Sequence, residues 1–352
     1  MKTADFDYAL PRKLIAQHPP RARDGARMMV LDPAAGQVSH AAIRDLPRFL
    51  RPGDLLVLND SRVLPARLIG RRPDGGEAEI LLLRPLNGPV SHEWEALVRP
   101  AKKLPEGTVL EYQGSSLTVT VRGPQRVSLA GTDDPLGEVR RIGVMPTPPY
   151  IKERLDDPDR YQTIYARREG SAAAPTAGLH FTSELLSAVR DAGVEVAFVT
   201  LHVGLDTFAP VRVDNPVQHP IHKEAFELGA ATANAVMETR RRKGRVVAVG
   251  TTCVRTLESC AADGMVRPRA GWTDLLILPG FRFRVVDAML TNFHLPRSSL
   301  LMLVSAFAGR ERVLAAYAEA VRMGYRFFSF GDCMFITGRD LPPPSGEGGG
   351  PA

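Results

Sequence analysis

Residues 68–150 differ in pattern from the chain on either side, and this break limits the folds that the sequence allows. Within it, short segments of alternating apolar and polar residues, such as 77–83 and 117–121, are separated by Gly and Pro, and no helical periodicity persists. Short strands at this spacing are typical of a small antiparallel sheet or barrel. We therefore expect residues 68–150 to form a β-rich, barrel-like domain inserted into a larger one.

The chain outside this insertion alternates between buried strand-like runs and helical segments. Before the insertion, strands are expected at 28–32 and 54–58, with a helix at 40–50 between them. The alternation predicts an α/β domain, with a mostly parallel sheet and helices on both faces, built from residues 1–67 and 151–340. After the insertion, the expected helices are 183–192, 230–243, 254–263, 298–308 and 311–323, and the expected strands are 194–203, 245–250, 274–278 and 325–330.

Two residues have the character of helix N-caps. Thr182 precedes the helix at 183–192, and Ser298 opens the apolar helix that follows it. Hydroxyl side chains at this position accept a hydrogen bond from a free backbone N–H of the first turn. At the other end of the domain, the low-complexity tail at 341–352 is expected to be disordered.

Charge and composition set broad limits on location and partners. The 352 residues carry a formal net charge of +6, which suits a polyanionic partner. However, only seven of the 45 basic residues are lysine and the rest are arginine. A GC-rich genome produces the same excess of arginine without any nucleic-acid partner. No apolar run is long enough to span a membrane, and the first residues have no secretory hydrophobic region. The three cysteines form no CxxC motif and fit reduced thiols. We expect a cytoplasmic, monomeric protein that binds no membrane.

Common catalytic motifs are absent from the sequence. It contains no GxGxxG after a strand, no GxxxxGK[ST], no HExxH, no GxSxG and no paired CxxC. His219 and His222 stand three residues apart with Glu224 beyond them, but without a cysteine at metal spacing they are expected to be surface or capping histidines. No metal site is predicted, and any active site must be built from less familiar parts.

Polar residues follow the predicted strands at the edge where ligands bind in open α/β sheets. Each has a structural alternative, such as an Asx turn or a helix cap. Three histidines are harder to explain in this way. His180, His202 and His294 lie at the ends of predicted elements in uncharged surroundings, where an imidazole must either be hydrogen-bonded or take part in binding or catalysis. A shared pocket is predicted from them. The polar residues at this edge are Asn59 to Arg62, His202, Gly204, Gly250 to Thr252, Arg255, Asn292, His294, Arg297, Ser298 and Asp332.

Several long strings in the chain are characteristic of one known family. The chain resembles the S-adenosylmethionine:tRNA ribosyltransferase-isomerases, enzymes of queuosine biosynthesis, from its N-terminus almost to its tail. The strings that carry the resemblance are DFDYALP (5–11), DLLVLNDSRVLPARL (54–68), APTAGLHFT (174–182), LHVG (201–204), VAVGTT (247–252), VRTLES (254–259), TNFHLP (291–296), SLLMLVSAFAG (299–309) and YRFFSFGDCMFI (325–336).

The resemblance implies an unusual transfer reaction. The ribosyl moiety of S-adenosylmethionine would pass to a 7-aminomethyl-7-deazaguanine at the wobble position of a tRNA and become an epoxycyclopentane. The products would be epoxyqueuosine-tRNA, adenine and methionine. S-adenosylmethionine would be consumed as a substrate, so that no cofactor is expected and a methyltransferase glycine motif is not required.

This chemistry needs acid–base groups that work near neutral pH. For that role we predict His180, His202 and His294, with Glu224 and Asp60 as further candidates. Arg62 and Arg255 are predicted to hold a carboxylate or phosphate. The remaining predicted substrate-binding residues are Gly204, Gly250, Thr252 and Asn292.

The chain departs from the family pattern at a few positions. Cys253 stands where Ser is expected, and Asp206 stands where Gly is usual, which puts the 204–208 loop in doubt as a substrate-binding loop. The alternatives to a ribosyltransferase are an RNA methyltransferase and a non-catalytic RNA-binding module. Candidate tRNA-binding cations are Arg71 with Arg72, Arg99 with Lys102 and Lys103, Arg140 with Arg141, and residues 240–243.

Overall fold

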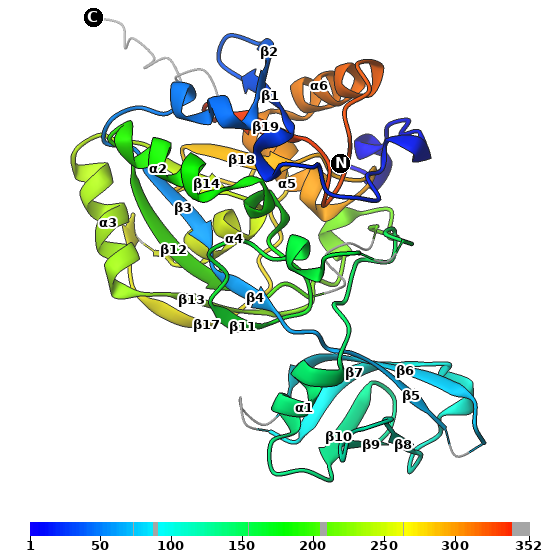
Figure 1. Cartoon of the computed structure of the whole chain (residues 1–352). Helices are drawn as coiled ribbons and strands as arrows, with labels where there is room; N and C mark the ends of the chain where they lie inside the picture. Colours follow the sequence, from blue (N-terminus) through cyan, green and yellow to red (C-terminus); the bar gives the residue numbers. More distant parts are fainter. Residues whose placement is uncertain (73, 87–90, 154, 205–209, 263, 340–352) are drawn as a thin grey trace, which may run out of the picture.

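The computed structural model shows an α/β body to which a small barrel is attached through two adjacent chain segments (Figure 1). It describes residues 1–72, 74–86, 91–153, 155–204, 210–262 and 264–339. The tail at 341–352 and Asp206 lie outside the described residues. The α/β class with an inserted β-barrel, predicted from the sequence, is confirmed.

A nine-stranded sheet forms the centre of the body, and its four inner strands are parallel to one another. Antiparallel strands extend both edges, so the sheet is mixed outside its centre. In spatial order the strands are β17 (Arg269–Thr273), β13 (Glu224–Leu228), β12 (Glu195–Leu201), β3 (Leu55–Asn59), β14 (Val246–Val249), β18 (Ala288–Asn292), β19 (Cys333–Ile336), β1 (Arg27–Asp32) and β2 (Gln37–Ala42).

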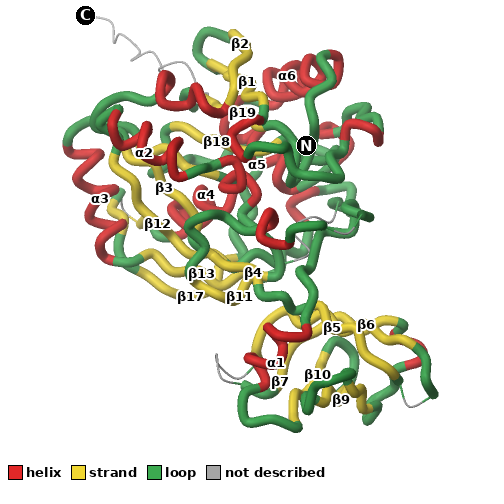
Figure 2. Tube along the Cα trace, viewed as in Figure 1, coloured by secondary structure: helices red, strands yellow, loops and turns green. Residues whose placement is uncertain are grey.

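Helices cover both faces of the sheet (Figure 2). Strand β3 shows why: Leu55 and Val57 belong to one apolar cluster and Leu56 and Leu58 to the other, because alternate side chains of a strand point to opposite faces. One cluster includes α3 (Ala230–Arg241), α4 (Thr251–Ser259), α5 (Ser299–Ala308) and α6 (Arg310–Arg322), and the other includes α2 (Ser183–Asp191) and the 3-10 helix Ile43–Phe49.

Helix starts agree with the two predicted N-caps. Thr182 Oγ1 accepts from Leu185 N at 3.1 Å at the start of α2, and Ser298 Oγ accepts from Leu301 N at 3.2 Å at the start of α5. Other short 3-10 helices lie at Thr3–Phe6, Arg12–Leu14, Arg23–Gly25, Ala101–Lys103, Pro158–Tyr161, Thr176–His180 and Pro216–Gln218.

The inserted segment closes into a six-stranded barrel around its own apolar core. Leu68, Ile80, Leu110 and Val127 are fully buried in it. The domain boundaries at 67/68 and 150/151 stay predictions. The barrel elements are β5 (Arg67–Arg71), β6 (Glu77–Pro85), β7 (Glu93–Arg99), β8 (Val109–Glu111), β9 (Thr118–Val121) and β10 (Arg126–Ala130), followed by α1 (Pro135–Ile142).

Two small ribbons complete the described structure. Strand β4 (Ser61–Val63) pairs in parallel with β11 (Arg168–Ser171) and lies directly between the central strand β3 and the barrel. The second ribbon joins β15 (Ala261–Ala262) to β16 (Met265–Val266).

Three predicted elements are wrong. The expected helix at 40–50 is the end of β2 and a 3-10 helix, because residues 37–42 pair with β1 and Pro47 lies in the helix that follows. The expected strand at 274–278 has no regular structure, and the neighbouring polar residues form β17 instead. The expected strand at 325–330 is a turn in which Phe328 has a φ of 74°, and the strand begins at Cys333.

Candidate functional site

Four neighbouring parallel strands bring their carboxyl ends to one edge of the sheet. Strands β12 and β14 lie on opposite sides of β3, so the chain order reverses here, and such switch points are where α/β sheets bind ligands. Asn59 spans this point, because its Nδ2 donates to Leu201 O at 3.0 Å and to Thr252 Oγ1 at 3.2 Å. The edge predicted from the sequence is therefore assembled.

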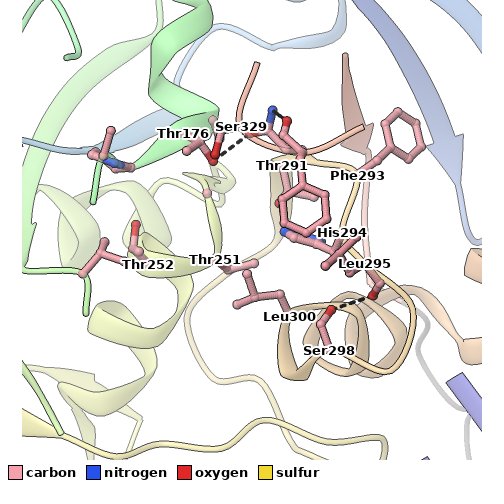
Figure 3. A pocket seen from close by; sticks show the side chains of 17 residues that line it. Thr176, Thr251, Thr252, Thr291, Phe293, His294, Leu295, Ser298, Leu300 and Ser329 are labelled. Carbon is pink, nitrogen blue, oxygen red and sulfur yellow. Dashed lines mark hydrogen bonds between the residues drawn. The ribbon is translucent and has the colours of Figure 1, made fainter. Parts of the chain in front are cut away.

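A small cavity of about 50 Å³, here called the inner pocket, opens at this edge (Figure 3). Helix α4 begins at it after Gly250, whose φ of 85° is in the left-handed region, and α5 begins at it after Ser298. Helix N-termini carry partial positive charge, so both helices favour negative charge in this pocket. Its polar lining includes Thr176, Thr251, Thr252, Thr291, Asn292, His294, Ser298 and Ser329.

Asn292 lines the inner pocket and is fixed by three hydrogen bonds. Its Oδ1 accepts from Thr176 Oγ1 at 3.2 Å, and its Nδ2 donates to Phe328 O at 3.1 Å and to His180 Nε2 at 3.3 Å. His180 does not line the pocket; it is buried behind Asn292, and this burial lowers its pKa to about 4, opposed in part by Asp332. Neutral His180 thus positions the Asn292 amide.

His294 lies in the wall of the inner pocket with loose hydrogen bonds. Its Nε2 is 3.4 Å from Thr291 Oγ1, and its Nδ1 is 3.4 Å from the hydroxyl of Tyr317. Burial lowers its pKa to about 3, so the imidazole is neutral at pH 7. It can exchange a weak internal hydrogen bond for one to a ligand.

A larger cavity of about 950 Å³, here called the outer groove, lies between the barrel and the sheet edge. Val203 and Leu300 line both cavities, so the two are adjacent. A groove of this size is large enough for a nucleoside-sized ligand. Its lining includes Arg84 and Glu95 of the barrel, and Glu169, Gly170, His202, Gly204, Arg212, His219, His222, Lys223, Glu224, Arg255 and Trp272 of the body.

His202 is a partly buried histidine of the outer groove. Its Nδ1 lies 2.8 Å from Ser61 Oγ, and burial lowers its pKa, opposed by Asp60 and Glu227. With Nδ1 protonated and donating to Ser61, the lone pair lies on Nε2. Gly170 packs against the ring, since a Cβ at that position would lie 3.0 Å from His202 Cε1. The ring is thus fixed by a hydrogen bond and a close backbone contact.

A buried ion pair joins Glu224 and Arg255 in the wall of the outer groove. Arg255 Nη1 contacts Glu224 Oε2, and its Nε donates to Leu275 O at 3.1 Å. The other carboxylate oxygen, Glu224 Oε1, accepts from Gly204 N at 3.0 Å. Arg255 therefore holds Glu224 in place, and the pair fixes the start of the loop after β12.

The model of a protein family described as "Queuosine biosynthesis protein" matches residues 3–336. The chain belongs to the queuosine biosynthesis protein family. Proteins named S-adenosylmethionine:tRNA ribosyltransferase-isomerase from Symbiobacterium thermophilum and Carboxydothermus hydrogenoformans are each 52% identical, over 345 and 342 residues; each match covers 96% of this chain and 100% of the relative. A crystal structure of S-adenosylmethionine tRNA ribosyltransferase from Thermotoga maritima is 40% identical with a TM-score of 0.56, over 94% of this chain and 99% of that one. The resemblance stated from the sequence is confirmed, and the chain is an enzyme of the queuosine biosynthesis family.

Three predicted site residues of this queuosine biosynthesis enzyme line neither cavity: Asp60, Arg62, and His180, which lies behind Asn292. Asp60 is buried, accepts from Thr200 Oγ1 at 2.6 Å and pairs with Arg167 at 2.7 Å. Arg62 lies 3.9 Å from Glu169. Their predicted roles remain untested, but both side chains are placed to join β4 to its neighbours. Of the other predicted residues, Gly250, Thr252, Asn292 and His294 line the inner pocket, and His202, Gly204, Glu224 and Arg255 line the outer groove.

Five of the eleven predicted tRNA-binding cations are already neutralised by neighbours. Arg72 pairs with Asp74, Arg140 with Glu169, Arg141 with Glu138, Arg241 with Glu238, and Arg242 with Glu195. No ion pair within the described ranges involves Arg71, Arg99, Lys102 or Lys103. Across those ranges no helix has the length and apolarity to cross a bilayer, and no cluster of three potential metal ligands occurs.

Sequence reasoning missed Phe328 and Trp272. Phe328 was expected inside a strand, whereas its φ of 74° is rare for a bulky residue. Two hydrogen bonds hold this conformation: Phe328 N donates to Phe293 O, and Phe328 O accepts from Asn292 Nδ2. Trp272 lies on an edge strand that the sequence did not predict.

Burial of His180 makes the stability of the enzyme depend on pH. Its folded pKa of about 4 lies below the usual histidine value of 6.5, so as the pH falls the unfolded chain binds the proton first. Stability is therefore lost between pH 6.5 and 4. At pH 4.5 the free energy of unfolding, measured by urea denaturation relative to pH 7, should fall by about 2 kcal/mol more in the wild type than in His180→Gln. Equal falls in the two proteins would contradict a neutral buried His180.

Proposed function

We propose that this enzyme transfers and isomerises the ribosyl moiety of S-adenosylmethionine onto 7-aminomethyl-7-deazaguanine at the wobble position of a tRNA. The products are epoxyqueuosine-tRNA, adenine and methionine, and S-adenosylmethionine is a consumed substrate rather than a cofactor. We further propose that the enzyme acts in the cytoplasm as a monomer. Support comes from the family, and from relatives named for this activity that align over nearly the whole chain.

One observation of the structure carries the proposal most directly. A groove of about 950 Å³ meets a smaller pocket at the switch point of the sheet, and burial lowers the pKa of His202 in the groove and of His294 in the pocket. The groove has room for a sulfonium nucleoside together with part of a nucleotide. Neutral imidazoles suit the proton transfers that this reaction requires.

His202 is proposed as the general base. The sulfonium of S-adenosylmethionine acidifies the adjacent ribose carbon, and Nε2 of His202 can accept that proton while Nδ1–H donates to Ser61. The imidazolium that results lies in the field of Asp60 and Glu227, both of which favour the charged ring. Ser61 thus orients the base, and the two carboxylates stabilise its protonated form.

The inner pocket is proposed to stabilise the negative charge that develops later in the reaction. Adenine leaves with an electron pair, and closure of the epoxide passes through an alkoxide on the former ribose. The N-termini of α4 and α5, which begin at Thr251 and Ser299, both favour negative charge there. Asn292 and His294 line the same pocket and can supply hydrogen bonds.

The products distinguish this reaction from methyl transfer. Wild-type protein is incubated with S-adenosylmethionine and tRNA bearing 7-aminomethyl-7-deazaguanine, and the small molecules are separated by liquid chromatography. Adenine and methionine should appear in equal amounts and only when that tRNA is present. Release of S-adenosylhomocysteine would reject the proposal in favour of a methyltransferase, and equal turnover with guanine at the wobble position would reject the proposed acceptor.

A further inference from the structure

Trp272 is the one exposed residue among the tryptophans, tyrosines and phenylalanines of the part of the chain that the structure describes. It lies on β17, an edge strand of the sheet, lines the outer groove and is 49% exposed. Exposed indole surface is unfavourable in water, and an aromatic ring in a groove is a typical anchor for a flat ligand. None of the proton-transfer roles proposed above uses Trp272.

The barrel contributes a cation to the same place. The guanidinium carbon of Arg84, on β6, lies 5.2 Å from the centroid of the Trp272 ring, and Arg84 is held by a 2.5 Å hydrogen bond to Glu95. Trp272 therefore lies where the barrel and the body meet. A planar guanidinium beside an indole provides two flat surfaces on which a nucleobase can stack.

Two further cations, Arg212 and Lys223, line the outer groove, and neither forms an ion pair within the described residues. Other arginines of the body are neutralised, such as Arg241 by Glu238 and Arg242 by Glu195. Unpaired cations beside an exposed aromatic ring are the combination that binds single-stranded nucleic acid: the ring stacks on a base and the cations contact phosphates. The net charge of +6 favours the same polyanionic partner.

We propose that Trp272 is a stacking platform for an unpaired base of the tRNA anticodon loop, next to the nucleotide that reacts, and that Arg212 and Lys223 bind phosphates of that loop. This inference rests on the proposed function, because it takes tRNA as the substrate. The inference adds the location of the anticodon loop, which would lie across the outer groove, between β17 and the barrel and within reach of His202. Trp272 is a positioning residue that stacks on the RNA and takes no part in proton transfer.

The two tryptophans of the chain allow this contact to be observed directly. Trp94 is buried in the barrel at 4% exposure, so Trp272 is the residue whose fluorescence an RNA loop would change. Unmodified tRNA transcript is titrated into the wild type, Trp94→Phe and Trp272→Phe. Quenching should persist in Trp94→Phe and disappear in Trp272→Phe. Quenching that survives in Trp272→Phe would overturn the proposal.

Affinity and kinetics test whether the contact is stacking. Trp272→Ala should weaken tRNA binding and raise the KM for tRNA about 10-fold, with Trp272→Phe in between, because stacking on an aromatic ring is lost. The KM for S-adenosylmethionine should not change. Arg212→Ala and Lys223→Ala should each lower the slope of log K against log salt by about one. Ile69→Ala, an equally exposed apolar residue on the barrel outside the groove, should leave all values unchanged.

The outcomes separate this inference from the proposed function. If the wild type releases adenine with modified tRNA but Trp272→Ala binds tRNA as tightly as the wild type, the stacking platform is rejected and the function stands. If Trp272 fluorescence responds to tRNA but no adenine is released, the function is rejected and the docking surface stands. Equal competition for Trp272 by fully double-stranded RNA or by a peptide would reject a single-stranded loop as the occupant.

Discussion

Replacing His202 with alanine should lower kcat by about 10²- to 10⁴-fold, the usual contribution of a general base. His202 lines the outer groove, and its only side-chain hydrogen bond among the described residues is to Ser61 Oγ. Its removal should therefore cost far more activity than stability, and the thermal midpoint should move by a few degrees at most. Single-turnover release of adenine, at saturating tRNA and S-adenosylmethionine, measures the effect on the chemical step.

The pH profile and two control variants sharpen this test. A base whose pKa is lowered by burial is active when neutral, so wild-type kcat should fall as the pH drops through that lowered pKa, and this acidic limb should be absent in His202→Ala. Ser61→Ala should lower kcat by a smaller factor, because the base is kept but is less well oriented. His18→Ala, a surface histidine paired with Glu153, should have no effect. Retention of wild-type kcat by His202→Ala would remove it from the mechanism.

Replacing Arg255 with methionine should lower the free energy of unfolding by about 3–5 kcal/mol, the usual cost of removing one member of a buried ion pair. Glu224 would keep the hydrogen bond from Gly204 N but lose the guanidinium that neutralises it. Turnover should fall as well, because Glu224 and Gly204 both line the outer groove. Urea denaturation at pH 7 measures the loss of stability.

The matching double variant identifies the cause of that loss. Glu224→Gln combined with Arg255→Met removes both charges, so it should be clearly more stable than Arg255→Met alone. The difference between the double and single variants measures the cost of keeping the Glu224 carboxylate after Arg255 is removed. If Arg255→Met lost less than about 1 kcal/mol, or if the double variant were the less stable of the two, the buried pair would not be holding the groove together.

The sequence predicts the fold best where burial decides the local structure. The apolar run at 54–58 is a central strand, and Thr182 and Ser298 cap helices as expected. It fails where backbone pairing decides instead. The polar edge strand RAGWT at 269–273 is held by its register with β13, whereas the more apolar 274–278 faces the outer groove without strand pairing. Propensity alone cannot distinguish these two neighbours.

The candidate site, like the fold, can be predicted from the sequence only in part. Rules for the carboxyl ends of strands place Gly250, Asn292 and His294 at one pocket and His202 at the next, because parallel neighbouring strands end at the same edge. The sequence does not reveal that His180 lies behind Asn292, or that Arg255 is occupied by Glu224. Those distinctions depend on contacts between residues more than 30 positions apart. Trp272 and Arg84 meet only because the barrel lies next to the edge strand β17 (Figure 1).

The mass of the modified wobble nucleoside tests the central claim most directly. tRNA bearing 7-aminomethyl-7-deazaguanine is treated with the enzyme and S-adenosylmethionine, digested to nucleosides and analysed by mass spectrometry. The account predicts that this nucleoside gains the mass of S-adenosylmethionine less adenine and methionine, and that His202→Ala forms it far more slowly. A gain of one methyl group, or no gain in a sample that has released adenine, would contradict ribosyl transfer to this base.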